Sequence, residues 1–297
     1  MSESEKTPGK DGNGPQAEAA ELRRKLRLLD RTESRFRSWQ LAEPGFESIL
    51  KELREDPPPP TAEGGMIYTS SGKRVWHLRR DSGEKVYDFA YKTNPGKARL
   101  RYIINSSLPV REVRNYLLME SLGIPVAHVL AVGDERRWFV LRETFLVTEF
   151  LADTRDGRDF DPRGPLYADM ERKMEFCRLH LEQLAKIHNA SVFHKSYHPR
   201  NLLWRERGGK MEIFLIDVPR CKREPRFRMF RAAVVDLHSF FRDLLLPRAR
   251  VEELIAHYLK FRTQDSAPKA EELLDALIHF RRRPFSRRKY RLFAEEE

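Results

Sequence analysis

Hydrophobic periodicity changes once along the chain, and this change constrains the fold more than any other feature. Up to about residue 150, apolar residues fall in short strand-like runs separated by turn signals such as Asp81-Ser82-Gly83-Glu84. From residue 170 onward, apolar positions recur at steps of three and four, as along one face of a long helix. These positions are Met170, Met174, Cys177, Leu181, Leu184 and His188. We therefore expect an α+β chain in which a small β-rich part precedes a larger helical part.

Composition suggests three segments. Residues 1–62 have the character of an N-terminal extension: the first 16 are polar and of disordered composition, and residues 17–30 suit a polar helix. Pro57-Pro58-Pro59-Pro60 then forms a stiff spacer. We expect a β-rich lobe over residues 63–150 and a helical lobe over residues 151–297, which ends in a basic tail.

Charge and cysteine content restrict the kinds of partner and the cellular compartment that we expect for the protein. The net charge of +11 favours polyanionic partners such as anionic lipid, phosphorylated glycan or nucleic acid. Two cysteines, Cys177 and Cys221, do not make a disulfide framework and indicate a reducing compartment. The sequence shows neither an apolar run of about 18 residues nor a signal peptide, so we expect a cytoplasmic location.

Two basic stretches are the candidates for contact with a polyanion. The first follows Asp217 and interleaves with Phe227 and Phe230, and the second lies beside Phe285 and Tyr290. The basic residues are Arg220, Lys222, Arg223, Arg226, Arg228 and Arg231 in the first stretch, and Arg281, Arg282, Arg283, Arg287, Arg288, Lys289 and Arg291 in the second. A solvated charge run is the ordinary explanation, and binding to an anionic surface is the alternative that we retain.

The β-rich part contains a predicted hairpin with a lysine on its second strand. If its turn centres on Ser82-Gly83, antiparallel pairing brings Lys92 opposite Lys73 and Gly72. The lysine would then lie beside a loop of small residues.

A helix and further strands are expected after this hairpin. Ser107 can cap the helix, Pro109 suits its first turn, and Leu122-Gly123-Ile124-Pro125 ends it. Residues 126–132 and 138–150 are strand-like.

A second turn signal brings two oxygen-bearing side chains together. Gly208-Gly209 lies between two apolar runs and predicts a hairpin. Pairing about this turn places Asn201 almost opposite Asp217, and paired residues lie about 5 Å apart. Amide and carboxylate oxygens are suitable ligands for Mg²⁺, which also keeps waters and substrate phosphates. The hairpin therefore predicts a magnesium site at its open end.

Four nearby histidines raise the alternative of a zinc site: His180, His188, His194 and His198. His188 completes the apolar face of the predicted helix, and no cysteine or acid joins the set at ligand spacing. We do not expect a zinc cluster.

The segment around Asn201 and Asp217 resembles a kinase catalytic loop followed by its metal-binding aspartate. The residues that carry the resemblance are His194-Lys195-Ser196-Tyr197-His198-Pro199-Arg200-Asn201 and Phe214-Leu215-Ile216-Asp217. The resemblance implies that His194 supports the loop and that Asn201 and Asp217 are the Mg²⁺ ligands.

Other positions follow the kinase order. Lys92 resembles the strand lysine that contacts nucleotide phosphates, and Glu112 its ion-pair partner. Asp236 resembles the helix aspartate that braces the catalytic loop, and Gly72 and Glu149 are further implied nucleotide contacts. A solvated strand lysine and an acid complementing a helix dipole are the ordinary alternatives for Lys92 and Glu112.

Among kinase-like proteins, the chain resembles the lipopolysaccharide kinase family, which phosphorylates Kdo or heptose in the inner core. The glycine-poor phosphate loop, the compact N-lobe and the sequence Asn-Tyr-Leu-Leu-Met-Glu-Ser-Leu-Gly-Ile-Pro-Val at 115–126 carry this resemblance. It implies a two-lobed, protein-kinase-like fold that uses ATP and Mg²⁺. It also implies a phosphotransferase acting on an alcohol group, namely a sugar hydroxyl of an anionic glycolipid, in peripheral contact with the inner face of the inner membrane.

Ser196 departs from the kinase pattern because it stands two residues after His194, at the position of the catalytic aspartate. A serine does not accept a proton at neutral pH as a carboxylate does, and such base assistance is worth roughly 10²–10⁴-fold in rate. We expect a kinase in which Ser196 lines the acceptor site. The alternatives are a pseudokinase that binds or scaffolds on the same fold, and a basic nucleic-acid binder, for which the sequence shows no recognition motif.

Overall fold

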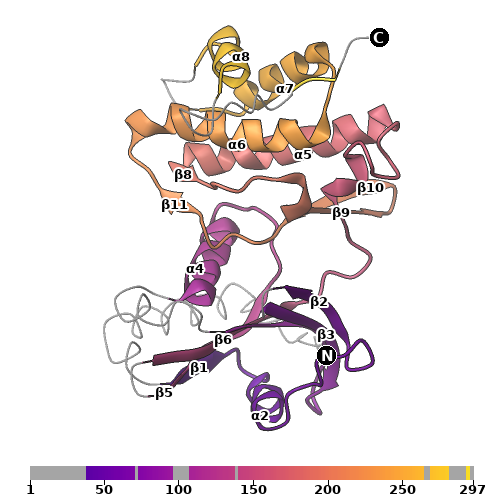
Figure 1. Ribbon diagram of the computed structural model, residues 1–297, viewed down its shortest axis with the longest axis vertical. Helices are drawn as coiled ribbons and strands as arrows, with labels where there is room; N and C mark the ends of the chain where they lie inside the picture. The colour runs from indigo at the N-terminus through magenta and orange to yellow at the C-terminus, as the bar shows by residue number, and fades with distance from the viewer. Residues whose placement is uncertain are drawn as a thin grey trace, which may run out of the picture. The chain divides into compact units, whose positions relative to one another are not determined.

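The computed structural model describes residues 38–70, 73–95, 107–137, 140–263, 268–280 and 292–294. These residues form two compact units, coloured along the chain in Figure 1. Unit 1 contains the described residues up to Val110 together with Val129–Glu149, and unit 2 contains Arg111–His128 and the described residues from Phe150 onward. Unit 1 is rich in strands and unit 2 in helices, which confirms the expected α+β class.

Unit 1 is built on a six-stranded antiparallel sheet (Figure 1). In spatial order its strands are β1 (Trp39–Ala42), β5 (Val129–Arg137), β6 (Val140–Glu149), β4 (Val86–Pro95), β3 (Lys73–Asp81) and β2 (Met66–Ser70). Along β4, buried Tyr87, Phe89 and Tyr91 alternate with more exposed residues. This alternation is typical of an antiparallel sheet with one face packed on a core.

Helix α2 (Glu47–Glu55) supplies that core from a segment that the sequence interpretation assigned to an extension. Its residues Ile49, Leu50 and Leu53 are buried in one cluster with the aromatic residues of the sheet. Strand β1 also pairs with β5 along its whole length. The expected extension over residues 1–62 is therefore wrong for residues 39–55, because this short amphipathic helix gains its stability from tertiary packing. Residues 1–37 lie outside the described part of the chain.

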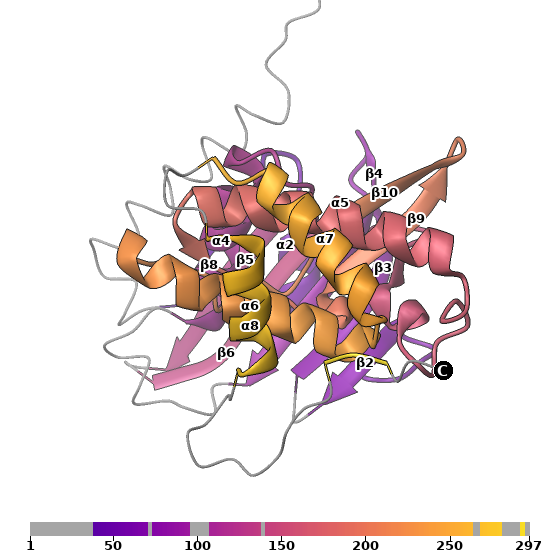
Figure 2. The same cartoon turned by 90° about the horizontal axis from the view of Figure 1, so that it is seen from above.

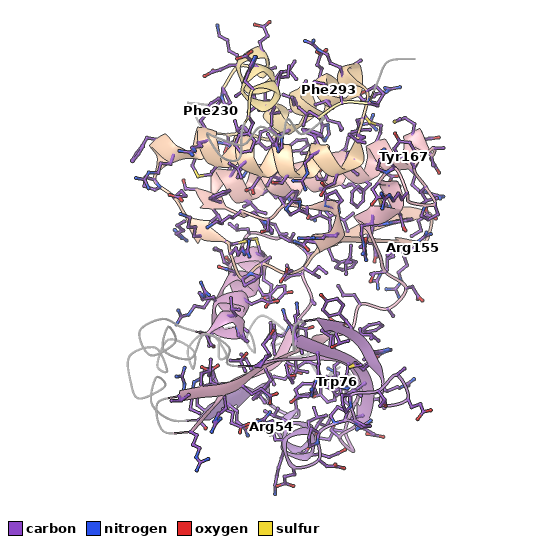
Figure 3. All side chains as sticks on the ribbon, in the orientation of Figure 1. Arg54, Trp76, Arg155, Tyr167, Phe230 and Phe293 are labelled. Atoms are coloured by element: carbon purple, nitrogen blue, oxygen red, sulfur yellow. The ribbon has the colours of Figure 1, made fainter. Side chains whose placement is uncertain are left out.

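Arg54, which is labelled in Figure 3, ties α2 to three strands of the sheet. Its Nη1 atom lies 3.1 Å from Glu143 Oε2 and donates to the hydroxyl oxygen of Tyr91 at 3.3 Å. Its guanidinium also pairs with Glu135 and lies over the ring of Phe145. A basic side chain at the end of α2 thus fixes the helix against the sheet.

The β3–β4 hairpin has a register different from the expected one. Lys92 lies opposite Val75, two residues from the predicted partner Lys73. The cause is a four-residue loop, in which the Ser82 N–H donates to the Lys85 carbonyl at 3.1 Å, in place of a two-residue turn. Gly72 lies outside the described residues.

Unit 2 consists mainly of helices (Figure 2). Helix α4 (Leu108–Ser121), whose first residues group with unit 1, begins directly after Ser107 and ends before Gly123, as the sequence predicts. The other helices are α5 (Met170–Asn189), α6 (Met229–Leu244), α7 (Arg248–Lys260) and α8 (Ala270–Ile278). Helix α7 packs against α5, and α8 packs against α6 and α7. Among the described residues, no helix combines the length and apolar character that crossing a bilayer requires.

In the described part of unit 2, two small sheets and three 3₁₀ turns accompany the helices. The first sheet has the order β10 (Lys210–Leu215), β9 (Leu202–Arg207) and β7 (Arg155–Asp156), and the second pairs β11 (Lys222–Arg223) with β8 (Val192–Phe193). The 3₁₀ turns are η1 (Gly157–Phe160), η2 (Pro199–Asn201) and η3 (Arg226–Arg228). The β9–β10 hairpin turns at Gly208 and Gly209, both with positive φ, as the turn chemistry predicts.

Truncation of Leu50, one of the buried side chains of α2, should show that this helix belongs to unit 1. We expect Leu50→Ala to lower the free energy of unfolding by about 2–5 kcal/mol, because it leaves a cavity against the sheet. Lys51→Ala, at the neighbouring exposed position, is the control and should change it by less than about 0.5 kcal/mol. Urea denaturation measures both, and equal effects would mean that α2 is not docked.

Candidate active site

The segment from His194 to Asn201 connects β8 to β9 and has a defined backbone shape. The Ser196 carbonyl accepts hydrogen bonds from the His198 N–H at 2.9 Å and from Asn201 Nδ2 at 3.0 Å. Lys195 has φ +69°, a left-handed conformation that is uncommon for a residue other than glycine. We call this segment the catalytic loop, after the kinase loop that its sequence resembles.

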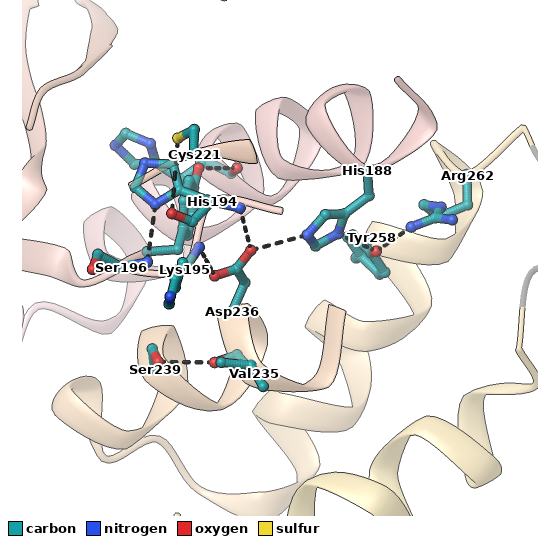
Figure 4. Close-up of polar contacts among 12 residues, drawn as sticks. His188, His194, Lys195, Ser196, Cys221, Val235, Asp236, Ser239, Tyr258 and Arg262 are labelled. Carbon is teal, nitrogen blue, oxygen red and sulfur yellow. Dashed lines mark hydrogen bonds and ion pairs between the residues drawn. The ribbon is translucent and has the colours of Figure 1, made fainter. Parts of the chain in front are cut away.

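Asp236 of α6 holds the start of the catalytic loop (Figure 4). Its carboxylate is fully buried, and its Oδ2 and Oδ1 atoms accept hydrogen bonds from the backbone N–H groups of His194, at 2.9 Å, and Lys195, at 2.8 Å. A buried charge is costly unless it is hydrogen-bonded, so these bonds tie the loop firmly to the helix.

Further hydrogen bonds run from Asp236 to the end of α7 (Figure 4). His188 Nε2 lies 3.2 Å from Asp236 Oδ2, and His188 Nδ1 lies 2.7 Å from the hydroxyl oxygen of Tyr258. Arg262 Nη1 donates to the same hydroxyl at 2.7 Å. Because a guanidinium only donates, the Tyr258 proton goes to Nδ1, and the Nε2–H group of His188 faces Asp236. We call His188, Tyr258 and Arg262 the supporting chain.

The sequence interpretation did not find the supporting chain. The helical periodicity assigns His188 to an apolar helix face, whereas both ring nitrogens of this buried side chain have polar partners. Tyr258 and Arg262 were not singled out. The available signal was that buried polar groups need hydrogen-bond partners, which applies to His188 and Asp236 on two apolar helix faces.

Three buried histidines of unit 2, His180, His188 and His194, have a lowered pKa and are neutral at pH 7. Burial lowers the pKa of His194 to about 4, although Asp236 and Asp217 oppose this effect. Burial also lowers the pKa of His180 to about 3, and it lowers the pKa of His188. A neutral His194 can accept at Nδ1 from the Ser196 N–H, which lies 3.3 Å away.

Asn201 and Asp217 lie at the open end of the β9–β10 hairpin, where the sequence predicts a magnesium site. Leu202 pairs with Leu215, and the Ile216 N–H donates to the Asn201 carbonyl at 3.0 Å, so Asp217 is the next residue beyond the pair. Asn201 Nδ2 is bonded to the Ser196 carbonyl, which turns the amide oxygen the other way. An amide oxygen and a carboxylate at adjacent positions fit Mg²⁺, which prefers oxygen ligands.

Helix α4 positions the segment that follows the hairpin. The hydroxyl oxygen of Tyr116 accepts from the Asp217 N–H at 3.3 Å, and Asn115 Nδ2 donates to the Val218 and Cys221 carbonyls at 2.6 and 3.2 Å. Asp217 has φ +57°, a conformation that aspartate and asparagine adopt more readily than most residues. The conformation at Asp217 is therefore built by contacts within unit 2.

His198 has a partner that sequence reasoning missed. Its Nδ1 atom lies 3.1 Å from Asp243 Oδ2 on α6. Burial alone would raise the pKa of Asp243, but hydrogen bonds from His198 and Arg242 bring that pKa below its ordinary value. Within the residues that the structure describes, no three His, Cys, Asp or Glu side chains converge as a metal site.

The remaining predicted site residues fall in different parts of the chain. Lys92 is partly buried in β4 between Val75 and Leu146 of the neighbouring strands, and Glu149 is exposed at the end of β6. Both belong to unit 1, whereas Glu112 is buried in the part of α4 that groups with unit 2. The set that unit 2 brings together is the partly exposed Ser196 with His194, Asn201, Asp217 and Asp236.

Removal of one hydroxyl should show that the supporting chain stabilises the loop. Tyr258→Phe leaves His188 Nδ1 and a guanidinium N–H of Arg262 without this partner, so we expect a loss of about 1–3 kcal/mol in unfolding free energy. Amide hydrogen exchange at Lys195 should also accelerate, since its N–H is bonded to Asp236. Tyr68→Phe, at an exposed position, is the matched control. No difference between the two variants would contradict the role of the chain.

Acidification should destabilise the protein. The unfolded state takes up protons on histidine near pH 6.5, whereas native His180 and His194 do so only near 3 and 4, so stability falls as pH drops below about 6.5. Between pH 7 and 5 the loss is roughly 2 kcal/mol for each of the two residues. In urea denaturation, His180→Phe should reduce the total loss of stability between pH 7 and 5 by roughly 2 kcal/mol. His279→Phe, which makes the same replacement at an exposed position, is the control. An unchanged pH slope in His180→Phe would refute the assignment.

Comparison with known proteins identifies the family. The family model described as lipopolysaccharide kinase (Kdo/WaaP) family matches residues 93–258, which is more than half of the chain. No curated protein matches the sequence.

Solved structures give weaker similarities. One is WaaP in complex with acyl carrier protein, with 16% identity, a TM-score of 0.49, and coverage of 80% of this chain and 92% of that chain. Another is the kinase domain of Mycobacterium tuberculosis PknI, as a double mutant with 14% identity and a TM-score of 0.41, covering 71% of this chain and 92% of that chain. A single mutant of the same domain gives 13% identity and a TM-score of 0.42, with the same coverage.

The matched segment contains the catalytic loop, Asp217 and Asp236, which are the parts of unit 2 described above. Along the chain, the strands of unit 1 come first and most helices of unit 2 follow, which is the order of a protein-kinase-like fold. The chain belongs to the lipopolysaccharide kinase (Kdo/WaaP) family, a family of kinases.

Proposed function

We propose that the protein transfers the γ-phosphoryl group of ATP to a sugar hydroxyl of an anionic glycolipid, in the inner core of lipopolysaccharide. The observation that supports this most is the placement of Asn201 and Asp217 beside the braced catalytic loop, in a member of a lipopolysaccharide kinase family. The acceptor oxygen forms a bond to the γ-phosphorus, the bond to the bridging β–γ oxygen breaks, and ADP leaves.

Each site residue has a role in this proposal. Asn201 and Asp217 hold Mg²⁺, which neutralises negative charge on the phosphates. Lys92 contacts the nucleotide phosphates with Glu112 as its ion-pair partner, and Gly72 and Glu149 make further nucleotide contacts. These last roles follow from the family resemblance, residue by residue. The protein would act in the cytoplasm, in peripheral contact with the inner face of the inner membrane.

Ser196 decides how the acceptor proton leaves. Phosphoryl transfer passes through a loose transition state in most analyses, so positioning and charge neutralisation carry most of the catalysis. In such a transition state the acceptor oxygen has formed little of its bond to phosphorus and carries little positive charge. Its proton can therefore pass to solvent without a carboxylate base. In this proposal Ser196 lines the acceptor site while Asp236 keeps the loop in position.

A second candidate function is a pseudokinase, and Ser196 is the observation that favours it. Such a protein would keep the braced loop and bind nucleotide without transferring phosphate. Loss of base assistance alone costs roughly 10²–10⁴-fold in rate, which slows a kinase without necessarily ending the reaction.

Phosphate transfer from labelled ATP to inner-core lipopolysaccharide in the presence of Mg²⁺ tests the proposal. We expect measurable transfer by the wild type and none by Asp217→Asn, because asparagine preserves the left-handed backbone but removes the charge that holds the metal. Asp275→Ala, at an exposed position on α8, is the control. Transfer that survives Asp217→Asn would refute the metal assignment.

Ser196→Asp in the same assay separates the two candidates. If only the base is missing, turnover should rise by about ten- to a thousandfold. Unchanged or lower turnover would mean that another group has taken over this role. A pseudokinase predicts no transfer by either protein, even if Mg-ATP raises the melting temperature.

A further inference from the structure

We infer that residues 220–231 of unit 2 form a docking surface for anionic phospholipid, beside the catalytic loop. We call these residues the basic-aromatic surface. The inference deepens the proposed function, because the purpose of docking rests on that function. Lipid binding itself can be tested without any phosphate transfer.

Two phenylalanines of this surface are exposed to solvent, Phe227 largely and Phe230 in part. Phe227 is 79% exposed and Phe230 is 37% exposed, within four residues of each other (Figure 3 labels Phe230). Single exposed apolar residues are ordinary on protein surfaces, but two aromatic rings at one place call for a partner. Every residue of η3, which carries Phe227, is unburied.

Positive charge surrounds the two rings. Six basic residues are exposed here: Arg220, Lys222, Arg223, Arg226, Arg228 and Arg231. Glu224 is the one acid among residues 220–231, which leaves six positive charges against one negative, or +5. Glu224 pairs with Lys222 and lies 4.0 Å from Arg228, and the hydrogen bond from Lys222 lowers its pKa, so it stays charged. The surface still holds almost half of the net charge of the chain, which is +11.

The surface is fixed to unit 2 through residues that alternate with the exposed ones. Cys221 is buried, and its carbonyl accepts from Asn115 Nδ2 at 3.2 Å. The Glu224 N–H donates to the Ser191 carbonyl at 2.9 Å, and Met229 is buried at the start of α6. The rings and cations are thus presented on an ordered backbone, which lowers the entropy lost on binding.

The same contacts place the surface next to the catalytic loop. Lys222 of β11 pairs with Phe193 of β8, the residue before His194. Cys221 Sγ lies 3.8 Å from the His194 carbonyl oxygen. A membrane bound at this surface would therefore bring glycolipid headgroups of the same leaflet close to the loop that carries Ser196.

A bilayer fits this pattern better than a protein partner. Arginine and aromatic residues are enriched at protein interfaces, but charged residues as a class are depleted at their centre, whereas here a net charge of +5 accompanies two exposed rings. At a bilayer surface the rings enter the boundary of the acyl chains, while the arginines reach the phosphates. Each basic residue near an anionic leaflet adds roughly fivefold to partitioning, and salt screens this attraction.

Vesicle co-sedimentation of the full chain tests the inference. We expect binding to phosphatidylcholine vesicles that contain phosphatidylglycerol, weak binding to phosphatidylcholine alone, and loss of binding at high salt. Phe227→Ser/Phe230→Ser and Arg226→Glu/Arg231→Glu should each lower binding at least tenfold. Lys51→Glu/Lys269→Glu makes the same change in net charge at exposed positions elsewhere and should have a smaller effect.

Three outcomes would overturn the inference. The first is equal binding to both vesicle types. The second is that Arg226→Glu/Arg231→Glu and Lys51→Glu/Lys269→Glu lower binding equally while Phe227→Ser/Phe230→Ser leaves it unchanged. The third is that the surface captures an acidic protein but the chain does not bind vesicles. The basic tail at residues 281–291 lies outside the described residues. Because all variants keep it, its contribution is common to them.

Phosphate transfer in two formats separates this inference from the proposed function. With deacylated, soluble core oligosaccharide, the Phe227→Ser/Phe230→Ser variant should match the wild type. With glycolipid embedded in vesicles, the variant should fall at least tenfold below it, and equal rates would count against docking. If the wild type transfers no phosphate in either format, the proposed function fails while the vesicle experiment still decides the docking surface.

Discussion

The buried carboxylate of Asp236 is the interaction on which the rest of unit 2 depends. It accepts hydrogen bonds from two consecutive backbone N–H groups of the catalytic loop and from a neutral histidine. A charge without solvent is stable only while those donors are in place, so the loop, α5 and α6 hold one another. The supporting chain extends this dependence to α7, because the orientation of His188 is set by Tyr258 and Arg262.

The catalytic loop transmits this order to the candidate metal ligands. Asp236 fixes its first residues, and the Ser196 carbonyl in turn fixes the Asn201 amide. Asn201 is bonded to Ile216, the neighbour of Asp217, and α4 holds Asp217 from the other end through Tyr116. The arrangement of the candidate metal ligands is thus built from backbone and buried contacts, none of which requires a carboxylate at residue 196.

The same loop is joined to the basic-aromatic surface through β8 and β11. The proposed lipid-docking surface and the candidate metal ligands are therefore parts of one folded unit. In the proposed reaction, which has no carboxylate base at residue 196, positioning of the acceptor contributes a larger share of the rate enhancement, because proximity and orientation can lower the barrier by several kcal/mol. This gives a physical reason for a family member with Ser196 to depend on where its acceptor is held.

The sequence by itself determined the elements whose signals are local. Gly208-Gly209 fixed the register of the β9–β10 hairpin, since a two-residue turn with positive φ leaves no freedom in pairing. The periodicity over residues 170–188 likewise determined α5. Tertiary structure decided what distant segments contribute: the docking of α2 on the sheet, the four-residue β3–β4 loop that moved Lys92 opposite Val75, and the contact of His188 with Tyr258, which is 70 residues away. From the sequence one can infer only that a buried polar side chain needs a hydrogen-bond partner. The packing of the helices decides which residue that partner is.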